Sequence, residues 1–303
     1  MSSESNSKFR DYFTKTSKPM LLDGAIGTQL MLRGLKLGEC PEMWNIDKPK
    51  IVQEVSSNYF NAGSDAVLTN TFGANPIRLR KFDLEESSYT LNREGAQIAL
   101  SVCPKNKLVL GSIGPTGEFI MPYGNLSEKE VIETYSDQIM GLADGGVDAF
   151  ILETFEDLKE MECVVTAIKD NSNLPYLCSM TFAKSPAGYF TTMGVSVAEA
   201  VNNLQCNGAF AVGSNCGNGI ESIIEIAVEM RKISKNIRIF FEPNAGSPKL
   251  FNGIDTYDET PAFFREHLPK LLEYNISLIG GCCGTTPKHI KVMREFLDES
   301  YRA

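Results

Sequence analysis

The sequence predicts a single (β/α)8 barrel, in which eight parallel strands alternate with eight helices. Eight short apolar runs recur along the 303 residues, and an amphipathic stretch of helical length follows each of them. Eight strand–helix units are the number that closes such a barrel. In addition, polar, glycine-rich and thiol-bearing residues follow the ends of the runs, and this is the end of a barrel that carries active sites. An open doubly wound sheet is the competing architecture.

The predicted strands are mostly short, continuous and rich in Val, Ile, Leu or Phe, as expected of strands covered on both faces. They span residues 20–23, 65–70, 107–113, 148–153, 176–182, 209–215, 237–242 and 277–281. The predicted helices span residues 49–61, 86–102, 127–145, 156–170, 196–206, 219–234, 260–274 and 286–301, with Pro261 and Pro287 in first turns. Residues 1–17 are expected to form a polar lead-in, partly helical at most, and residues 18–303 the barrel domain.

The composition narrows the class of protein. With 43% hydrophobic and 22% charged residues the chain is expected to be globular, and its net charge of −9 argues against binding to nucleic acid. No stretch approaches the roughly 18 uninterrupted apolar residues of a membrane span. The first residues lack the apolar core of a secretion signal, so a cytoplasmic location is expected. There, the eight cysteines are expected to be thiols or metal ligands rather than disulfides.

Three cysteines are candidate zinc ligands. Cys282 and Cys283 follow the last predicted strand between glycines, and Cys216 follows the sixth. These strand ends lie two strands apart, roughly 10 Å, a gap that cysteine side chains can close around a metal. Three thiolates with one open position are typical of a catalytic site. The alternative is that the vicinal pair forms a redox disulfide or is two ordinary thiols.

The other potential ligands are less well placed. The two histidines, His267 and His289, fall inside predicted helices and are not expected to bind metal. The five remaining cysteines are expected to be small buried side chains or surface thiols: Cys40, Cys103, Cys163, Cys178 and Cys206.

An open thiolate site favours a substrate with a soft donor atom, such as a thiol, which becomes a nucleophilic thiolate on coordination. Asp23 and Glu153, at strand ends, could bind an ammonium group, and backbone N–H groups of the turn at residues 24–28 could hold a carboxylate. Asp23 could instead cap a helix, and Glu153 could be a solvated charge. Asn244 is a further candidate, although it could simply belong to a turn.

Several motifs resemble the homocysteine S-methyltransferase family over residues 18–297. They are Leu22-Asp23-Gly24-Ala25-Ile26-Gly27-Thr28, Thr69-Asn70-Thr71-Phe72, Asn215-Cys216 and Gly281-Cys282-Cys283-Gly284-Thr285-Thr286-Pro287. The resemblance implies a barrel that binds Zn²⁺ through the three cysteines and presents homocysteine as a zinc thiolate. It further implies that Asp23 and Glu153 bind the amino group and that the Ala25–Ile26 backbone lies near the carboxylate. Asn70, in the second motif, is counted among the substrate-binding residues.

Within the family, the chain looks most similar to the homocysteine-binding module of cobalamin-dependent methionine synthase. In that branch the asparagine that matches Asn244 can occupy the open zinc position until homocysteine displaces it. The branch continues into folate- and cobalamin-binding regions that these 303 residues do not contain, so a methylcorrinoid protein on a separate chain is the expected methyl donor.

Other interpretations stay open. The donor could be S-methylmethionine, S-adenosylmethionine or betaine, and the acceptor could be a different thiol. A function of another class is a redox or ligand sensor, in which Cys282 and Cys283 respond to oxidants without methyl transfer.

Overall fold

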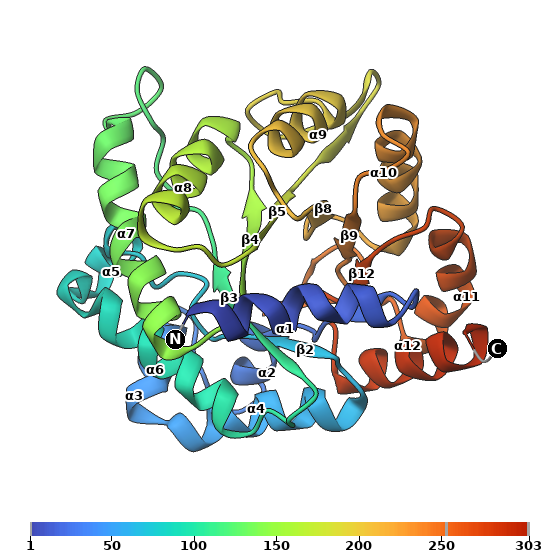
Figure 1. The fold of residues 1–303 in the computed structure, drawn as a ribbon, viewed down its shortest axis with the longest axis horizontal. Helices are drawn as coiled ribbons and strands as arrows, with labels where there is room; N and C mark the ends of the chain where they lie inside the picture. The colour runs from blue at the N-terminus through green and yellow to red at the C-terminus, as the bar shows by residue number, and fades with distance from the viewer. Residues whose placement is uncertain (1, 252–253, 302–303) are drawn as a thin grey trace.

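A ring of eight parallel strands forms the centre of the protein, with helices around it (Figure 1). The computed structural model describes residues 2–251 and 254–301. All eight predicted strands are present: β1 Met20–Leu21, β2 Ala66–Leu68, β3 Leu108–Ile113, β4 Ala149–Phe155, β5 Tyr176–Met180, β8 Ala211–Asn215, β9 Ile239–Glu242 and β12 Leu278–Ile279. Their order is β1-β12-β9-β8-β5-β4-β3-β2, so barrel strands that are consecutive in the chain are also neighbours in space. A doubly wound sheet reverses its order part-way, and the barrel prediction is therefore confirmed.

Aspartate side chains help to join the two edge strands, β1 and β2, where the ring closes. One backbone hydrogen bond crosses this seam, from the Asp65 N–H to the Leu21 carbonyl at 2.6 Å. The Asp65 carboxylate accepts from the Leu21 N–H, and the Asp23 carboxylate accepts from the Leu68 N–H at 2.9 Å. Asp23 therefore contributes to the closure of the barrel and also lies at its mouth.

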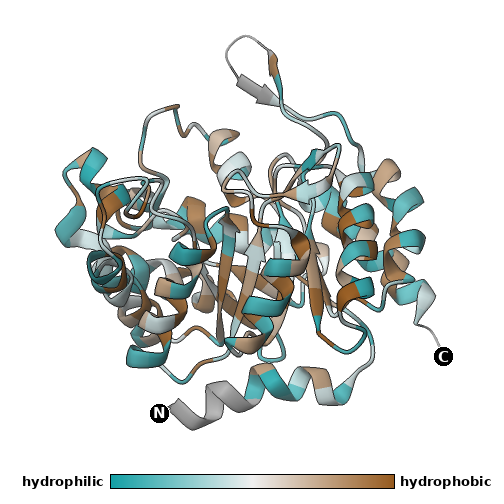
Figure 2. Ribbon diagram, turned by 90° about the horizontal axis from the view of Figure 1, so that it is seen from above, coloured by the Kyte–Doolittle hydropathy of each residue, from teal (hydrophilic) through white to brown (hydrophobic). Residues whose placement is uncertain are grey.

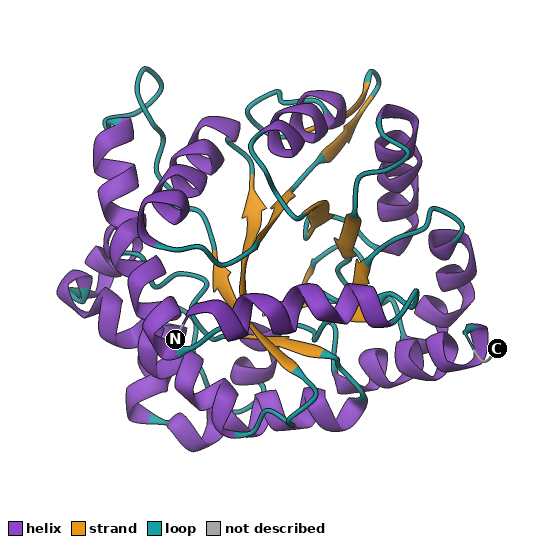
Figure 3. Ribbon diagram, viewed as in Figure 1, coloured by secondary structure: helices purple, strands orange, loops and turns teal. Residues whose placement is uncertain are grey.

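The eight predicted helices surround the barrel (Figure 3). They are α4 Pro49–Ala62, α6 Ser88–Ser101, α7 Glu128–Gly145, α8 Leu158–Asn171, α9 Val197–Cys206, α10 Ile220–Ile233, α11 Pro261–Leu272 and α12 Pro287–Ser300. Their boundaries follow local chemistry, because Pro261 and Pro287 stand in first turns and Ser127 forms a capping box with Glu130 at the start of α7.

Short elements lie in the connections, and of these only a helix at α2, after the turn at residues 24–28, was expected from the sequence. They are α2 Ile26–Met31, η1 Pro41–Met43, α3 Trp44–Asp47, α5 Pro76–Leu79, η2 Arg80–Phe82, η3 Glu85–Ser87, and two hairpins, β6 Ala183–Ser185 with β7 Gly188–Phe190 and β10 Lys249–Phe251 with β11 Ile254–Thr256. Each is too short to show a periodic hydrophobic pattern.

The amino-terminal segment corrects a prediction. Residues Ser2–Lys15 form one helix, α1, where at most a partly helical lead-in was expected. It crosses the end of the barrel at which the strands begin (Figures 1 and 2). Phe9 is fully buried there, with its ring 5.0 Å from that of Phe210. The helix thus closes the barrel floor with an aromatic contact that its mostly polar sequence concealed.

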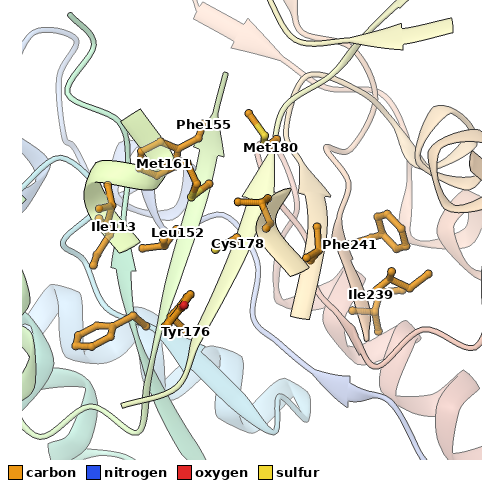
Figure 4. Close-up of a cluster of buried hydrophobic side chains, with 14 of the residues drawn as sticks. Ile113, Leu152, Phe155, Met161, Tyr176, Cys178, Met180, Ile239 and Phe241 are labelled. Atoms are coloured by element: carbon orange, nitrogen blue, oxygen red, sulfur yellow. The ribbon is translucent and has the colours of Figure 1, made fainter. Parts of the chain in front are cut away.

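Alternating strand residues fill two separate cores. One set points into the barrel and includes Met20, Leu110, Ile151 and Phe240. The other set packs between the strands and the helices, as Leu152, Cys178 and Phe241 do in Figure 4. Within the described residues, no helix is both long enough and apolar enough to span a bilayer.

A polar layer lies above the apolar filling of the barrel, towards the mouth. Strand side chains alternate between the two faces, so a residue two positions beyond an inward one also points inward. Four such pairs are Leu110 and Ser112, Ile151 and Glu153, Leu177 and Ser179, and Phe240 and Glu242. The inner end of the mouth, next to the apolar filling, is therefore lined by hydroxyl and carboxyl groups.

Candidate active site

The three candidate zinc ligands meet at the mouth. The sulfur atoms of Cys216, Cys282 and Cys283 all lie within 4.8 Å of one another. Cys283 is 3.8 Å from Cys216 and 4.0 Å from Cys282, measured between sulfurs. Among the described residues, no other group of histidine, cysteine or acidic side chains is close enough to share a metal ion. The prediction that these residues converge from distant parts of the chain is confirmed.

These distances fit a tetrahedral metal. Two sulfurs bound to zinc at about 2.3 Å with tetrahedral angles lie about 3.8 Å apart. No disulfide joins the three thiols, because a sulfur–sulfur bond is about 2.05 Å long, and all three are free. The donor set and its spacing therefore fit a zinc ion.

Backbone conformation brings Cys216 to this position. Its φ of +59° lies in the left-handed region, which residues other than glycine rarely adopt. Its N–H donates to the Glu242 carbonyl at 3.2 Å, which holds the end of β8 against β9. A strained backbone of this kind is common at functional sites, where the surrounding structure enforces it.

Hydrogen bonds to a neighbouring loop hold the Cys282–Cys283 pair in place. The Cys282 N–H donates to the Pro243 carbonyl at 2.8 Å, and the Cys283 carbonyl accepts from Ala245 at 2.9 Å. The Thr285 hydroxyl donates back to the Cys282 carbonyl at 2.7 Å. The loop after β12 is thus fixed to the loop after β9, and both thiols face Cys216.

The pKa of each of these thiols depends on its hydrogen bonds with the other two. Hydrogen bonds from the Cys216 and Cys282 thiols lower the pKa of Cys283 to about 3. Conversely, donating to its neighbours raises the pKa of Cys282 well above its usual range. The hydrogen bonds within the cluster therefore favour the thiolate form at Cys283 and disfavour it at Cys282. A divalent cation is needed to stabilise three thiolates in so small a volume.

Carboxyl groups line the mouth beside the thiols. Glu153, on β4, accepts from the Ser112 hydroxyl at 2.6 Å, and burial raises its pKa to about 7. Asp23 is 2% exposed, and burial raises its pKa well above the usual value. It does not cap α2, whose N-cap is Ala25 without a side-chain bond. The prediction that Asp23 and Glu153 bind an ammonium group is consistent with these positions and remains a prediction.

Glu242 was not predicted as a site residue, although it is the last residue of β9. Its side chain is 2% exposed, and its Oε2 atom is buried without a hydrogen-bond partner among the described residues. Burial, and then the charges of Glu153, Asp23 and Cys216, raise its pKa well above the usual value. The alternation of β9 could have found it, since Glu242 lies two residues beyond the inward Phe240.

Two of three further predicted substrate contacts, Asn70 and Ala25, are partly occupied by the protein itself, and the third, Ile26, is not. The Asn70 side chain donates to the Pro41 carbonyl and to Asn45, at 2.8 and 3.0 Å, so its oxygen is the group that remains for a ligand. The Ala25 N–H donates to the Thr285 hydroxyl at 3.1 Å. The first turn of α2, which begins at Ile26, has no side-chain cap.

Asn244 is 2% exposed, and its side-chain oxygen is buried without a partner among the described residues. Turn formation was the alternative role, but a turn does not require a buried, unpartnered amide oxygen. The amide is therefore available to a ligand at the mouth.

Asn215 supports the site and was not predicted as a functional residue. Its oxygen accepts from the Thr154 N–H and the Ser179 hydroxyl, both at 2.7 Å. Its amide nitrogen donates to the Cys282 sulfur at 3.8 Å. Asn215 thus ties the end of β8 to β4, where Thr154 also has a positive φ of 66°.

His267 lies in α11 and His289 in α12, so the prediction that both histidines fall inside helices is confirmed. His289 contacts Thr286 through Nδ1 at 3.0 Å and the Glu259 carbonyl through Nε2 at 3.0 Å. His267 contacts the Phe263 carbonyl within α11.

The comparisons with known proteins agree with this geometry. A family model described as homocysteine S-methyltransferase matches residues 20–297. This chain belongs to that family. The methionine synthase of Mycobacterium tuberculosis (strain ATCC 25618 / H37Rv) is 31% identical over 296 residues, and that of Mycobacterium leprae (strain TN) is 31% identical over 298 residues. These matches cover 91% and 92% of the chain but 24% of each relative, so the chain spans about a quarter of their length.

The solved structures support the fold. The metallated form of the homocysteine methyltransferase MmuM from Escherichia coli superposes with a TM-score of 0.80 at 23% identity, covering 95% of this chain and 99% of that one. Its apo form gives a TM-score of 0.73 at 21% identity, with the same coverage.

Proposed function

We propose that this member of the family is a zinc-dependent S-methyltransferase that methylates homocysteine to methionine. The observation that carries the proposal is the convergence of three thiols, within 4.8 Å of one another, beside buried carboxyl groups at the mouth of the barrel. Zinc bound by Cys216, Cys282 and Cys283 would lower the pKa of a coordinating substrate thiol, so that its sulfur is a nucleophile near neutral pH.

The remaining residues bind and orient the substrate. In this proposal Asp23 and Glu153 hold the ammonium group, and the first turn of α2 at Ile26, which has no side-chain cap, offers backbone N–H groups to the carboxylate. The Asn244 amide oxygen, buried and without a protein partner in the described part of the chain, is a weak ligand that a soft substrate sulfur can displace.

We further propose that the methyl group comes from a methylcorrinoid protein on a separate chain. The support is the 31% identity to methionine synthases that are about four times longer than the matched region. Sulfur attack on a cobalt-bound methyl group needs an accessible nucleophile and little acid–base machinery, in keeping with the two histidines of the chain.

The direct test supplies zinc-loaded protein with homocysteine and one donor at a time: a methylcorrinoid, S-methylmethionine, S-adenosylmethionine or betaine. Methionine is measured by mass spectrometry. The proposal expects turnover with methylcorrinoid. Turnover with a sulfonium or betaine alone would show that the proposed donor is wrong and that homocysteine is still the acceptor. Failure to form methionine with any donor would contradict the proposed reaction.

The thiol spacing also admits a redox sensor, and metal analysis separates the two functions. One zinc per chain supports the methyltransferase. A metal-free protein that forms a reversible disulfide within the cluster would support the sensor instead.

Substrate binding is tested with Glu153→Gln. We expect weaker homocysteine binding in calorimetry while zinc stays bound, because the variant loses one charge-assisted acceptor and no thiol. Unchanged affinity would show that Glu153 has been assigned the wrong role.

A further inference from the structure

The side chain of Asn215, fully buried at the end of β8, lies beside the thiol cluster with both ends of its amide in hydrogen bonds. Its oxygen accepts from the Thr154 N–H and from the Ser179 hydroxyl, both at 2.7 Å. Its nitrogen donates to the Thr154 hydroxyl at 2.8 Å and to the Cys282 sulfur at 3.8 Å. A side-chain amide has two N–H donors, so one serves the hydroxyl and the other the sulfur.

The backbone of Thr154 determines which end of the amide faces the sulfur. A backbone N–H can only donate, so the Asn215 atom next to it has to be the oxygen, and the nitrogen then points towards Cys282. Thr154 presents this N–H with a φ of 66°, a conformation that β-branched residues rarely adopt. Strain of this kind persists where the surrounding structure enforces it, and it is common at functional sites.

A hydrogen bond to Cys282 bears on which sulfur receives the methyl group. With zinc bound, three protein sulfurs and the substrate sulfur would surround one ion, and each has a lone pair that can attack a methyl donor. In such an attack the lone pair forms the new S–C bond, and the donor keeps the electron pair of the bond that breaks. An N–H group directed at a sulfur withdraws electron density from it and makes it a weaker nucleophile.

We infer that Asn215 is a positioning residue that holds Cys282 through an N–H···S hydrogen bond and lowers the reactivity of its sulfur, so that the methyl group is transferred to the substrate. This inference rests on the proposed function and adds a residue that acts through one of the zinc ligands. The hydrogen bond itself can be tested without homocysteine or a methyl donor.

The test measures how fast each sulfur of the cluster is alkylated. Zinc-loaded wild-type protein and Asn215→Asp are treated with iodoacetamide, and mass spectrometry gives the initial rate at each cysteine. Asn215→Asp keeps an oxygen for the Thr154 N–H and the Ser179 hydroxyl, but it places a second oxygen, and no N–H, towards Cys282.

Two control variants receive the same treatment. Ser179→Ala removes one bond from the same network and retains the N–H of Asn215. Asn202→Asp, at an exposed position of α9, adds the same negative charge away from the mouth. Zinc content and thermal unfolding are measured for every variant.

Relative to the other two cysteines of the cluster, Cys282 is expected to be alkylated about two- to tenfold faster in Asn215→Asp than in wild type, the range for one neutral hydrogen bond. The ratio among the three rates should stay unchanged in Ser179→Ala and in Asn202→Asp. An unchanged ratio in Asn215→Asp, or an equal rise at all three cysteines, would overturn the inference, because Asn215 would then have only a structural role.

NMR on wild-type protein keeps the inference testable if Asn215→Asp fails to fold or to bind zinc. With an NMR-active cadmium isotope in place of zinc, an N–H···S hydrogen bond produces a scalar coupling between the amide proton and the metal. We expect this coupling at one asparagine side chain, whose nuclear Overhauser contacts are to Thr154 and Ser179. Absence of the coupling would contradict the hydrogen bond. The proposed function fails separately, if wild-type protein binds no homocysteine or yields no methionine with any donor.

Discussion

Asp65, at the floor of the barrel, differs from Glu153 and Glu242, at the mouth, in the charges that surround it. At the floor, Asp65 accepts from Tyr12, Lys107 and Arg294 at 2.8 to 3.0 Å. Burial opposes its charge, but Lys107, the Leu21 N–H and Arg294 outweigh burial and lower its pKa. At the mouth, burial raises the pKa values of Glu153 and Glu242, and the charge of Cys216 acts in the same direction on both.

This difference in partners distinguishes acidic residues that stabilise the fold from acidic residues that are available to a ligand. A buried charge with partners contributes to folding, whereas an acid without a cation costs stability and persists where a ligand supplies the cation. On this basis we interpret Asp65 as a structural residue and the acids at the mouth as candidate substrate-binding residues. The predictions below test the two ends separately, from the largest expected effect to the smallest.

The largest effect is expected from Cys216→Ala. Removing one of three thiolates should abolish stoichiometric zinc binding and reduce methyl transfer by about a thousandfold or more. Metal content by mass spectrometry and turnover measure the two effects. Cys206→Ala, which removes an exposed thiol at the end of α9, is the matched control and should retain zinc. Full zinc content in Cys216→Ala would remove this residue from the metal site.

Asp65→Asn should destabilise the fold without changing zinc or substrate binding at the mouth. It leaves Lys107 and Arg294 without their shared anion, so we expect the free energy of unfolding to fall by about 3 kcal/mol at pH 7. The folded pKa of Asp65 lies below its ordinary 3.8, so its stabilisation is present above that value and is lost as pH falls through the folded pKa. Urea unfolding at pH 7 and near pH 3 measures both. Zinc content and homocysteine affinity of the folded variant should match wild type, and a loss of zinc would contradict the separation of the two ends.

The sequence predicted the barrel and the thiol cluster because both depend on local signals. Continuous apolar runs define buried strands, and the Cys282–Cys283 pair at a strand end is an unusual pattern. Cys216 could be added because the strand count placed the sixth and eighth strand ends near each other. Residues whose role depends on the chain around them were harder to predict.

In the sequence, Glu242 cannot be distinguished from any other acidic residue at the end of a strand. Only the alternation of inward and outward residues along β9, together with the burial of its neighbours, identifies it as a residue that points into the barrel. Asn215 contacts Thr154 and Ser179 from different strands, a pairing that requires the closed ring. Helix α1 was underestimated because Phe9 is a single apolar residue in a polar stretch, and its partner Phe210 is 201 positions further along the chain. Sequence patterns reveal periodic burial, but they do not reveal contacts between distant residues.

The smallest effect concerns the pH dependence of the mouth, and its sign is opposite to that at the floor. The pKa of Glu153 is raised from 4.5 to about 7 in the folded protein, so the folded state binds more protons than the unfolded state between these values, and stability falls as pH rises through that window. Glu153→Gln should therefore stabilise the metal-free protein by about 1–2 kcal/mol at pH 8 and leave it unchanged near pH 4, since the carboxyl group is partly exposed and feels less than the full shift. Urea unfolding at both pH values measures this, with Glu295→Gln on the exposed face of α12 as control. A variant that is less stable than wild type at pH 8 would mean that Glu153 is compensated within the protein, and the contrast between the two ends would no longer hold.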